Sequence, residues 1–208
     1  MVDLVHLIVF YAFLGGSIKF IDQAYDEKAF SIRSAKVLAV LSGALMGYLM
    51  AQDSPFSTAF YAAMLISLVL ARKIDNFAFA TGTVLAVATF AAMYSSSGVV
   101  WLIAPVVVFL VAGFVDEVAD GMVDKYDVHG AWRIFLNYRP FSDLALLAMV
   151  LAGVFPWMYF LPYFSFTASY LLVERFSEHE LGLYDRVYDR VSQLRTRMPR
   201  LGLLRPFR

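Results

Sequence analysis

Aspartates are the residues of this chain whose number and spacing are best suited to chemistry. Five of them fall into two groups whose members follow one another at intervals of four residues: Asp22 and Asp26, then Asp116, Asp120 and Asp124. On a helix, this interval places side chains one above the other on a single face. Like charges in that arrangement repel, so a purely structural role disfavours it. A divalent cation bound between the carboxylates reverses the sign of the interaction.

The cation that suits these groups is Mg²⁺. Proteins usually hold magnesium with one or two carboxylates, while water and substrate phosphate oxygens complete its shell. Basic residues that could meet such phosphates are interleaved with the aspartates along the chain: Lys19, Lys73, Arg133 and Arg139. The pattern predicts a site for Mg²⁺ and a diphosphate. The alternative interpretation is that these charges mark helix ends at a membrane surface.

The overall composition is that of a membrane protein. Of 208 residues, 61% are hydrophobic and 16% are charged, and the mean hydropathy is +0.67. A soluble domain of this length needs a larger charged fraction to cover its surface. The lack of cysteine excludes disulfides and thiolate metal sites. No nucleic-acid-binding motif is present, so we expect no nucleic-acid partner.

The apolar residues form segments of the length that crosses a membrane, about 20 residues. Five candidate spans precede a polar stretch: 3–21, 36–52, 56–71, 76–94 and 98–115. A further apolar run, 141–173, is too long for one crossing. Gly153 and Pro156 offer a natural break in it, because proline removes a backbone donor and disfavours continued helix. The alternative is one long tilted helix with an interfacial piece.

The distribution of basic residues favours two crossings in this run. Lysine and arginine concentrate on the cytoplasmic side of membrane proteins. Here they follow the first, third and fifth candidate spans and recur after residue 174, whereas the connections 52–57 and 94–98 contain none. We therefore expect an all-α, polytopic transmembrane bundle of seven spans, with the N-terminus outside and the C-terminus inside. Six spans is the alternative.

The chain divides at the end of the apolar run. Residues 1–173 form the predicted transmembrane domain, and 174–208 a basic tail with apolar residues at helical spacing. Such a tail is typical of an amphipathic helix that binds anionic headgroups on the cytoplasmic face of a cell membrane. A solvated helix end is an equally good interpretation.

Both aspartate groups resemble motifs of the UbiA family of membrane prenyltransferases. The segment Asp116-Glu-Val-Ala-Asp-Gly-Met-Val-Asp124, followed by Arg133 and by Arg139-Pro-Phe-Ser142, is similar to the first motif of that family, NDxxDxxxD, and its basic loop. The segment at 21–27, followed by Ser31-Ile-Arg-Ser-Ala-Lys-Val-Leu38, is similar to the second. The two motifs occur here in the opposite order along the chain.

The resemblance implies a helical fold around a cavity, in which Mg²⁺ joins the aspartates to a prenyl diphosphate. Asp116, Asp120 and Asp124 would then match the first metal-binding motif, and Asp22 and Asp26 the second. Arg133 and Arg139 would meet the diphosphate, and the prenyl chain would pass to a lipophilic acceptor.

These observations lead to one functional hypothesis and two alternatives. The hypothesis is a membrane-embedded, Mg²⁺-dependent transferase acting on a prenyl or lipid diphosphate among membrane lipids. Its metal ligands would be the five aspartates, its catalytic residues Asp116, Asp120 and Arg139, and its phosphate-binding residues Lys19, Lys73, Arg133 and Arg139. The alternatives are a cation transporter or channel with an acidic inner vestibule, and a membrane protein without catalytic activity.

Overall fold

The chain is a bundle of helices. The computed structural model describes residues 2–97, 100–126 and 140–197, within which all regular structure is helical, as the all-α prediction requires. The elements are α1 (Leu4–Tyr25), α2 (Ile32–Gln52), α3 (Pro55–Leu70), α4 (Phe77–Ser97), α5 (Ile103–Tyr126), α7 (Pro140–Leu151), the 3₁₀ turn η1 (Trp157–Tyr159) and α8 (Phe160–Arg197).

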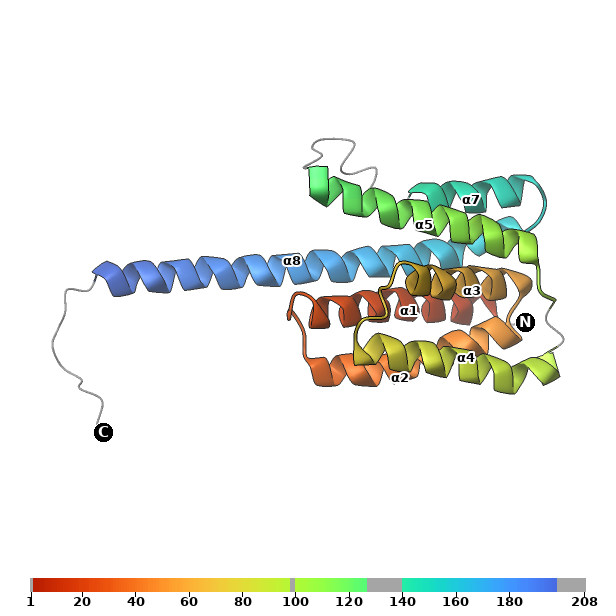
Figure 1. Cartoon of the computed structure of the whole chain (residues 1–208), viewed down its shortest axis with the longest axis horizontal. Helices are drawn as coiled ribbons and strands as arrows, with labels where there is room; N and C mark the ends of the chain where they lie inside the picture. The colour runs from red at the N-terminus through yellow and green to blue at the C-terminus, as the bar shows by residue number, and fades with distance from the viewer. Residues whose placement is uncertain (1, 98–99, 127–139, 198–208) are drawn as a thin grey trace.

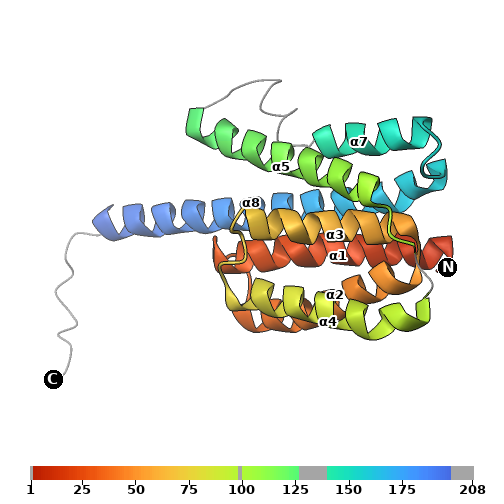
Figure 2. The same cartoon turned by 45° about the vertical axis from the view of Figure 1, so that its right-hand side comes forward.

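Successive helices run in alternating directions along a common axis (Figures 1 and 2). The closest helix pairs are α1 with α8 and α2 with α4, and α5 packs between α3 and α7. The connections 26–31 and 71–76 and the start of α7 therefore meet at one end of the bundle, which we name the charged end. The connections 53–54 and 152–156 lie at the opposite end, beside the N-terminus.

Three of the described helical segments are long and apolar enough to cross a membrane: Leu4–Tyr25, Ile32–Gln52 and Phe77–Ser95. Three shorter segments are also apolar: Pro55–Leu70, Ile103–Asp116 and Pro140–Leu151. Large hydrophobic side chains on these helices are exposed on the outside of the bundle, including Val5, Val84 and Ile103. Lipid would cover such side chains favourably, whereas water would not.

Polar side chains determine where several helices begin. Asp3 accepts a hydrogen bond from the Val5 amide at the start of α1, and Ser54 accepts one from the Ser57 amide at the start of α3. Asn76 does the same for Phe79 in α4. Each bond satisfies an amide that the first helical turn leaves without a partner.

The predicted break in the last apolar run is confirmed. The helix α7 ends at Leu151, Gly153 has a φ of +72°, and Pro156 precedes η1. Glycine suits this turn because a side chain disfavours positive φ. Beyond the turn, α8 continues for 38 residues, so the predicted domain boundary after residue 173 falls inside an unbroken helix. Its second half extends beyond the bundle (Figure 1).

Aromatic rings form the centre of the core. Tyr11, Phe56 and Tyr61 are fully buried, and Phe60 lies among them with its ring centroid 6.0 Å from that of Tyr11. Phe109 of α5 meets both Phe56 and Phe60 edge to face. This cluster joins α1, α3 and α5, so it fixes the helices that carry the polar groups described below.

Candidate functional site

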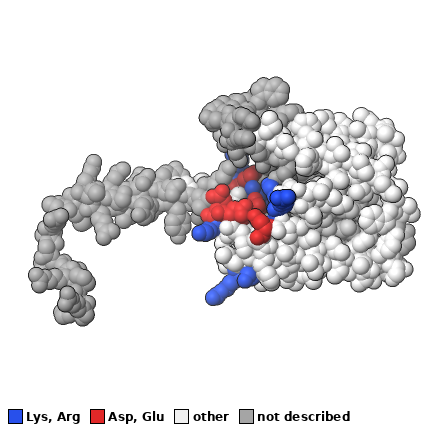
Figure 3. All heavy atoms as spheres, viewed as in Figure 1, with Lys and Arg blue, Asp and Glu red and all other residues white. Residues whose placement is uncertain are grey.

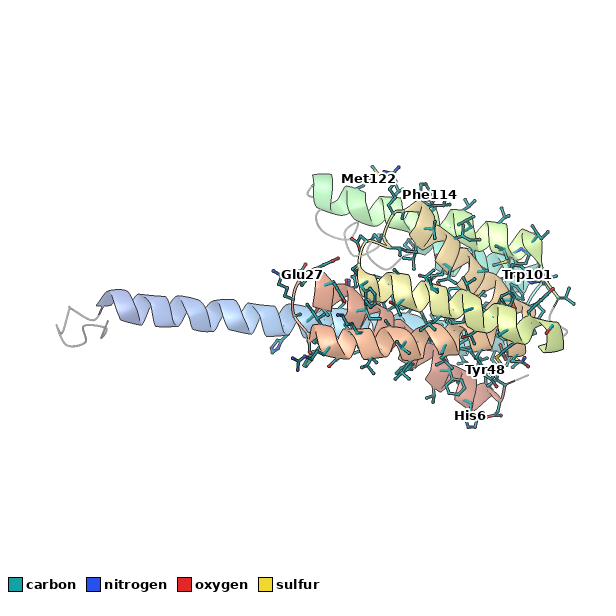
Figure 4. The ribbon with its side chains drawn as sticks, turned by 60° about the horizontal axis from the view of Figure 1, so that its bottom comes forward. His6, Glu27, Tyr48, Trp101, Phe114 and Met122 are labelled. Carbon is teal, nitrogen blue, oxygen red and sulfur yellow. The ribbon has the colours of Figure 1, made fainter. Side chains whose placement is uncertain are left out.

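Charged side chains gather at the charged end of the bundle (Figure 3). On the visible face, lysine, arginine, aspartate and glutamate lie at the end of the body from which α8 extends, and the described surface elsewhere on this face is uncharged. Figure 4 shows Glu27 at this end and Trp101 at the opposite one. The charged and uncharged ends are separated as the sequence predicts. Basic residues follow alternate spans, and alternate connections lie at the same end of an antiparallel bundle.

Lys19 lies between α1 and α8. Its side chain is 9% exposed, and Nζ is 3.2 Å from Asp22 Oδ2 and 2.9 Å from Glu174 Oε1. The ammonium also lies over the ring of Tyr170, 5.1 Å from its centroid. Two carboxylates and an aromatic face thus stabilise the positive charge of Lys19. A phosphate at this residue would have to compete with both carboxylates.

Carboxylates from two connections interact around Asp26. Burial raises the pKa of Asp26, and the negative charges of Asp22 and Asp75 raise it further, while Lys73 opposes them. Asp22 and Asp26 belong to the end of α1, and Asp75 and Lys73 to the connection between α3 and α4. The fold therefore brings the first predicted aspartate group beside a carboxylate to which the sequence analysis assigned no role.

Asp116 is held by the first turn of α7. It is 1% exposed, and it accepts hydrogen bonds from the Phe141 amide at 3.0 Å and the Ser142 amide at 2.8 Å. The Ser142 hydroxyl donates to the same carboxylate. Three of the roughly four acceptor positions of the carboxylate are used in this way. Asp116 therefore acts as a cap for α7, supplied by another helix.

The two predicted aspartate groups lie on helices that have different packing partners. Asp22 and Asp26 belong to the end of α1, which packs on α8 and α2, whereas Asp116 belongs to α5, which packs on α3 and α7. A shared metal site between the groups stays a prediction. The side chains of Asp120 and Asp124, and Arg133 and Arg139 entirely, lie outside the described residues.

An apolar cavity of about 100 Å³ lies between α3, α5, α7 and α8. Its apolar lining includes Phe60, Met64, Leu68, Phe109, Phe114 and Phe166. Ala71 and Ser142 also line the cavity. Both lie at the charged end, where α3 ends and α7 begins, so the cavity reaches toward that end. Phe114 is 46% exposed and lies on α5 at the rim (Figure 4).

Tyr163, which lines this cavity, forms a hydrogen bond that sequence reasoning missed. The Tyr163 hydroxyl donates to Asp143 Oδ1 at 2.8 Å, and this bond joins α8 to α7. An aspartate inside an apolar segment was the available signal, since such a residue needs a partner. Its partner Tyr163 could not be chosen among the chain's 12 tyrosines without the fold.

Compared with family models, with curated proteins and with solved structures, the chain matches none of them.

Proposed function

We propose that the protein crosses the membrane with seven helices and holds its charged end in the cytoplasm. The proposal is supported by the alternating helix directions, the apolar outer surfaces and the gathering of lysine and arginine at one end. The 16 residues of α3 rise about 24 Å, less than a hydrocarbon core of about 30 Å, so local thinning or tilt of neighbouring helices must accompany the crossing.

At the charged end, the protein binds Mg²⁺ together with a prenyl or lipid diphosphate and transfers the lipid group. The observation that supports this most directly is the position of Asp26, whose pKa is raised by burial and by the negative charges of Asp22 and Asp75, with Lys73 acting in the opposite direction. A site whose surrounding negative charges favour a bound proton also favours a divalent cation. Lys73 adds a positive charge where phosphate oxygens would lie.

The carboxylate oxygens at this end are the type of ligand that magnesium prefers. Aspartate oxygens are hard ligands, and Mg²⁺ needs only one or two of them when phosphate and water supply the rest. No group of three His, Asp or Glu side chains close enough to hold a metal occurs among the described residues. When bound, the metal would neutralise charge on the diphosphate leaving group. Asp22 and Asp26 would hold it, and the apolar helices would exclude water.

Thermal unfolding of the purified protein in detergent tests this proposal. Mg²⁺ and geranylgeranyl diphosphate, added together, should raise the midpoint by more than the sum of their separate effects, since each ligand completes the site of the other. The variant Asp26→Asn should lose this synergy. The variant Asp3→Asn, at the opposite end, should keep it, because asparagine also caps helices well.

The remaining outcomes separate the alternatives. A rise with Mg²⁺ alone that diphosphate does not increase would replace the transferase with the cation-transport hypothesis. An unfolding midpoint that none of the ligands changes would contradict the presence of this site. Synergy that persists in Asp26→Asn would move the site away from the end of α1.

A further inference from the structure

The cavity between α3, α5, α7 and α8 carries four hydroxyl groups, and each donates its proton to an acceptor in the protein. Two of these protons go to backbone carbonyls. Ser67 Oγ donates to the Ala63 carbonyl oxygen at 2.8 Å, and Thr167 Oγ1 donates to that of Tyr163 at 3.3 Å. A carbonyl oxygen can only accept, so the direction of both bonds is fixed.

The other two protons go to carboxylates. Ser142 donates to Asp116, and Tyr163 donates to Asp143 at 2.8 Å. In both bonds the hydroxyl is the donor and a carboxylate oxygen is the acceptor. Asp116 is buried and also accepts hydrogen bonds from two amides of α7.

With their protons engaged, the hydroxyls of Ser67, Ser142 and Thr167 keep lone pairs that can accept a hydrogen bond from a molecule in the cavity that they line. Apart from Gly113, the rest of the lining is aromatic and aliphatic. The cavity thus offers hydrogen-bond acceptors on an apolar wall. A molecule that itself only accepts hydrogen bonds, such as an ether, a carboxylate or a phosphate dianion, would lose its hydration here without compensation.

We propose that this cavity binds the end of a lipid alcohol, with the hydroxyl donating to a lone pair of the Ser142 hydroxyl and the chain lying against Phe60 and Phe166. A neutral hydroxyl suits the site better than an ammonium. An ammonium has three protons to satisfy and a charge whose desolvation is far more costly than that of a hydroxyl. The binding claim does not depend on the transfer reaction proposed for the charged end.

Photolabelling in lipid nanodiscs tests the claim. The probe is a long-chain alcohol with a diazirine near its hydroxyl, and labelled peptides are identified by mass spectrometry. Two matched probes carry a methyl ether or a phosphate in place of the hydroxyl. The alcohol should label residues of α3, α5 and α8 that line the cavity. The ether should label them about five- to tenfold less, the effect of one unmade buried hydrogen bond. The phosphate should label them less still, because its charge must also be desolvated.

Filling the cavity gives an independent check. A methyl group at Gly113 would meet Ser67 Oγ at 3.5 Å, an ordinary contact, so a larger side chain extends into the open space. Gly113→Leu should abolish labelling of the cavity residues, whereas Ala104→Leu, exposed on the same helix, should not change it. Thermal unfolding confirms that both variants are folded, and Gly113→Ala, expected to weaken labelling, replaces Gly113→Leu if that variant is not.

Two results would overturn the proposal. Equal labelling by the alcohol and the methyl ether would remove the hydrogen-bond argument. Alcohol labelling that is absent from the cavity residues, or that survives in a folded Gly113→Leu variant, would place the ligand elsewhere.

Discussion

Lys19 Nζ of α1 lies 2.9 Å from Glu174 Oε1 of α8, two residues from opposite parts of the sequence. Asp22 holds the same ammonium from the other side at 3.2 Å. The two carboxylates are 29% and 30% exposed, so neither is well solvated. One of the two closest helix pairs of the bundle, α1 with α8, is thus joined ionically at the charged end.

Replacing Lys19 with methionine should therefore destabilise the protein. The apolar substitute fills the space but leaves two partly buried carboxylates beside each other without a cation. We expect a loss of about 1–3 kcal/mol in unfolding free energy, below the value for fully buried pairs because water reaches both carboxylates. Thermal unfolding in detergent measures it. Lys36→Met, an exposed lysine over the Phe77 ring, is the control, and an equal effect there would contradict the role of the ion pair.

Asp116 should prove necessary for the docking of α7. Asp116→Leu leaves the first amides of α7 and the Ser142 hydroxyl without their acceptor, at a cost of about 2–4 kcal/mol. Asp116→Asn keeps one acceptor oxygen and should lose less. Limited proteolysis would detect release of α7. A Leu variant as resistant and as stable as the wild type would show that the cap is unimportant.

Adjacent glycines in α1 should respond differently to alanine. A methyl group at Gly15 would lie 2.1 Å from the Phe166 carbonyl oxygen of α8, whereas one at Gly16 would be 3.6 Å from Val173 Cγ2. The first contact is with backbone that cannot rotate away, so α1 and α8 must separate. We expect Gly15→Ala to lower stability by about 1–3 kcal/mol or more, and Gly16→Ala to be neutral. Unfolding midpoints of the two variants decide the point.

The sequence predicted the helices well because the pattern that reveals them is local. An apolar run of about 20 residues and a break at Gly153 and Pro156 act through near neighbours. Hydropathy bounds the apolar spans, not the helices. The first and fifth spans were predicted to end at residues 21 and 115, and the helices continue to Tyr25 and Tyr126, as the helical spacing of the aspartates implies. The backbone hydrogen bonds of a helix can continue into a polar segment, and hydropathy does not reveal a helix there.

The candidate site was predicted less completely because its contacts are not local. The sequence indicated that Asp22, Asp26 and Lys73 share one end, and the fold agrees. It could not indicate that Glu174 pairs with Lys19 or that α7 uses Asp116 as its cap, since both depend on which helices pack together.

The acidic cluster around Asp26 should make stability depend on pH. Its raised pKa means that the folded state holds the proton more tightly than the unfolded state does. Ionisation of Asp26 therefore costs stability as pH rises through the raised pKa, and Asp26→Asn removes that cost. The variant should equal the wild type below the ordinary pKa of about 3.9 and exceed it at pH 7. The gain should stay below about 1 kcal/mol, because Asp26 is largely exposed.

The orientation of the charged end can be tested with single cysteines, because the chain contains none of its own. Glu27 and Val100 are both exposed and lie at opposite ends of the bundle, Val100 beside Trp101 (Figure 4). Asp53, at the same end as Val100, is unsuitable because its carboxylate is buried and accepts bonds from Ser54 and Ser57. In intact cells, a membrane-impermeant maleimide should label Val100→Cys and not Glu27→Cys. Permeabilisation should make Glu27→Cys reactive, since lysines and arginines concentrate at that end and favour the cytoplasm.

Labelling of Glu27→Cys before permeabilisation, with Val100→Cys protected, would invert the proposed orientation. Equal labelling of both in intact cells would contradict the crossing of an odd number of helices between them.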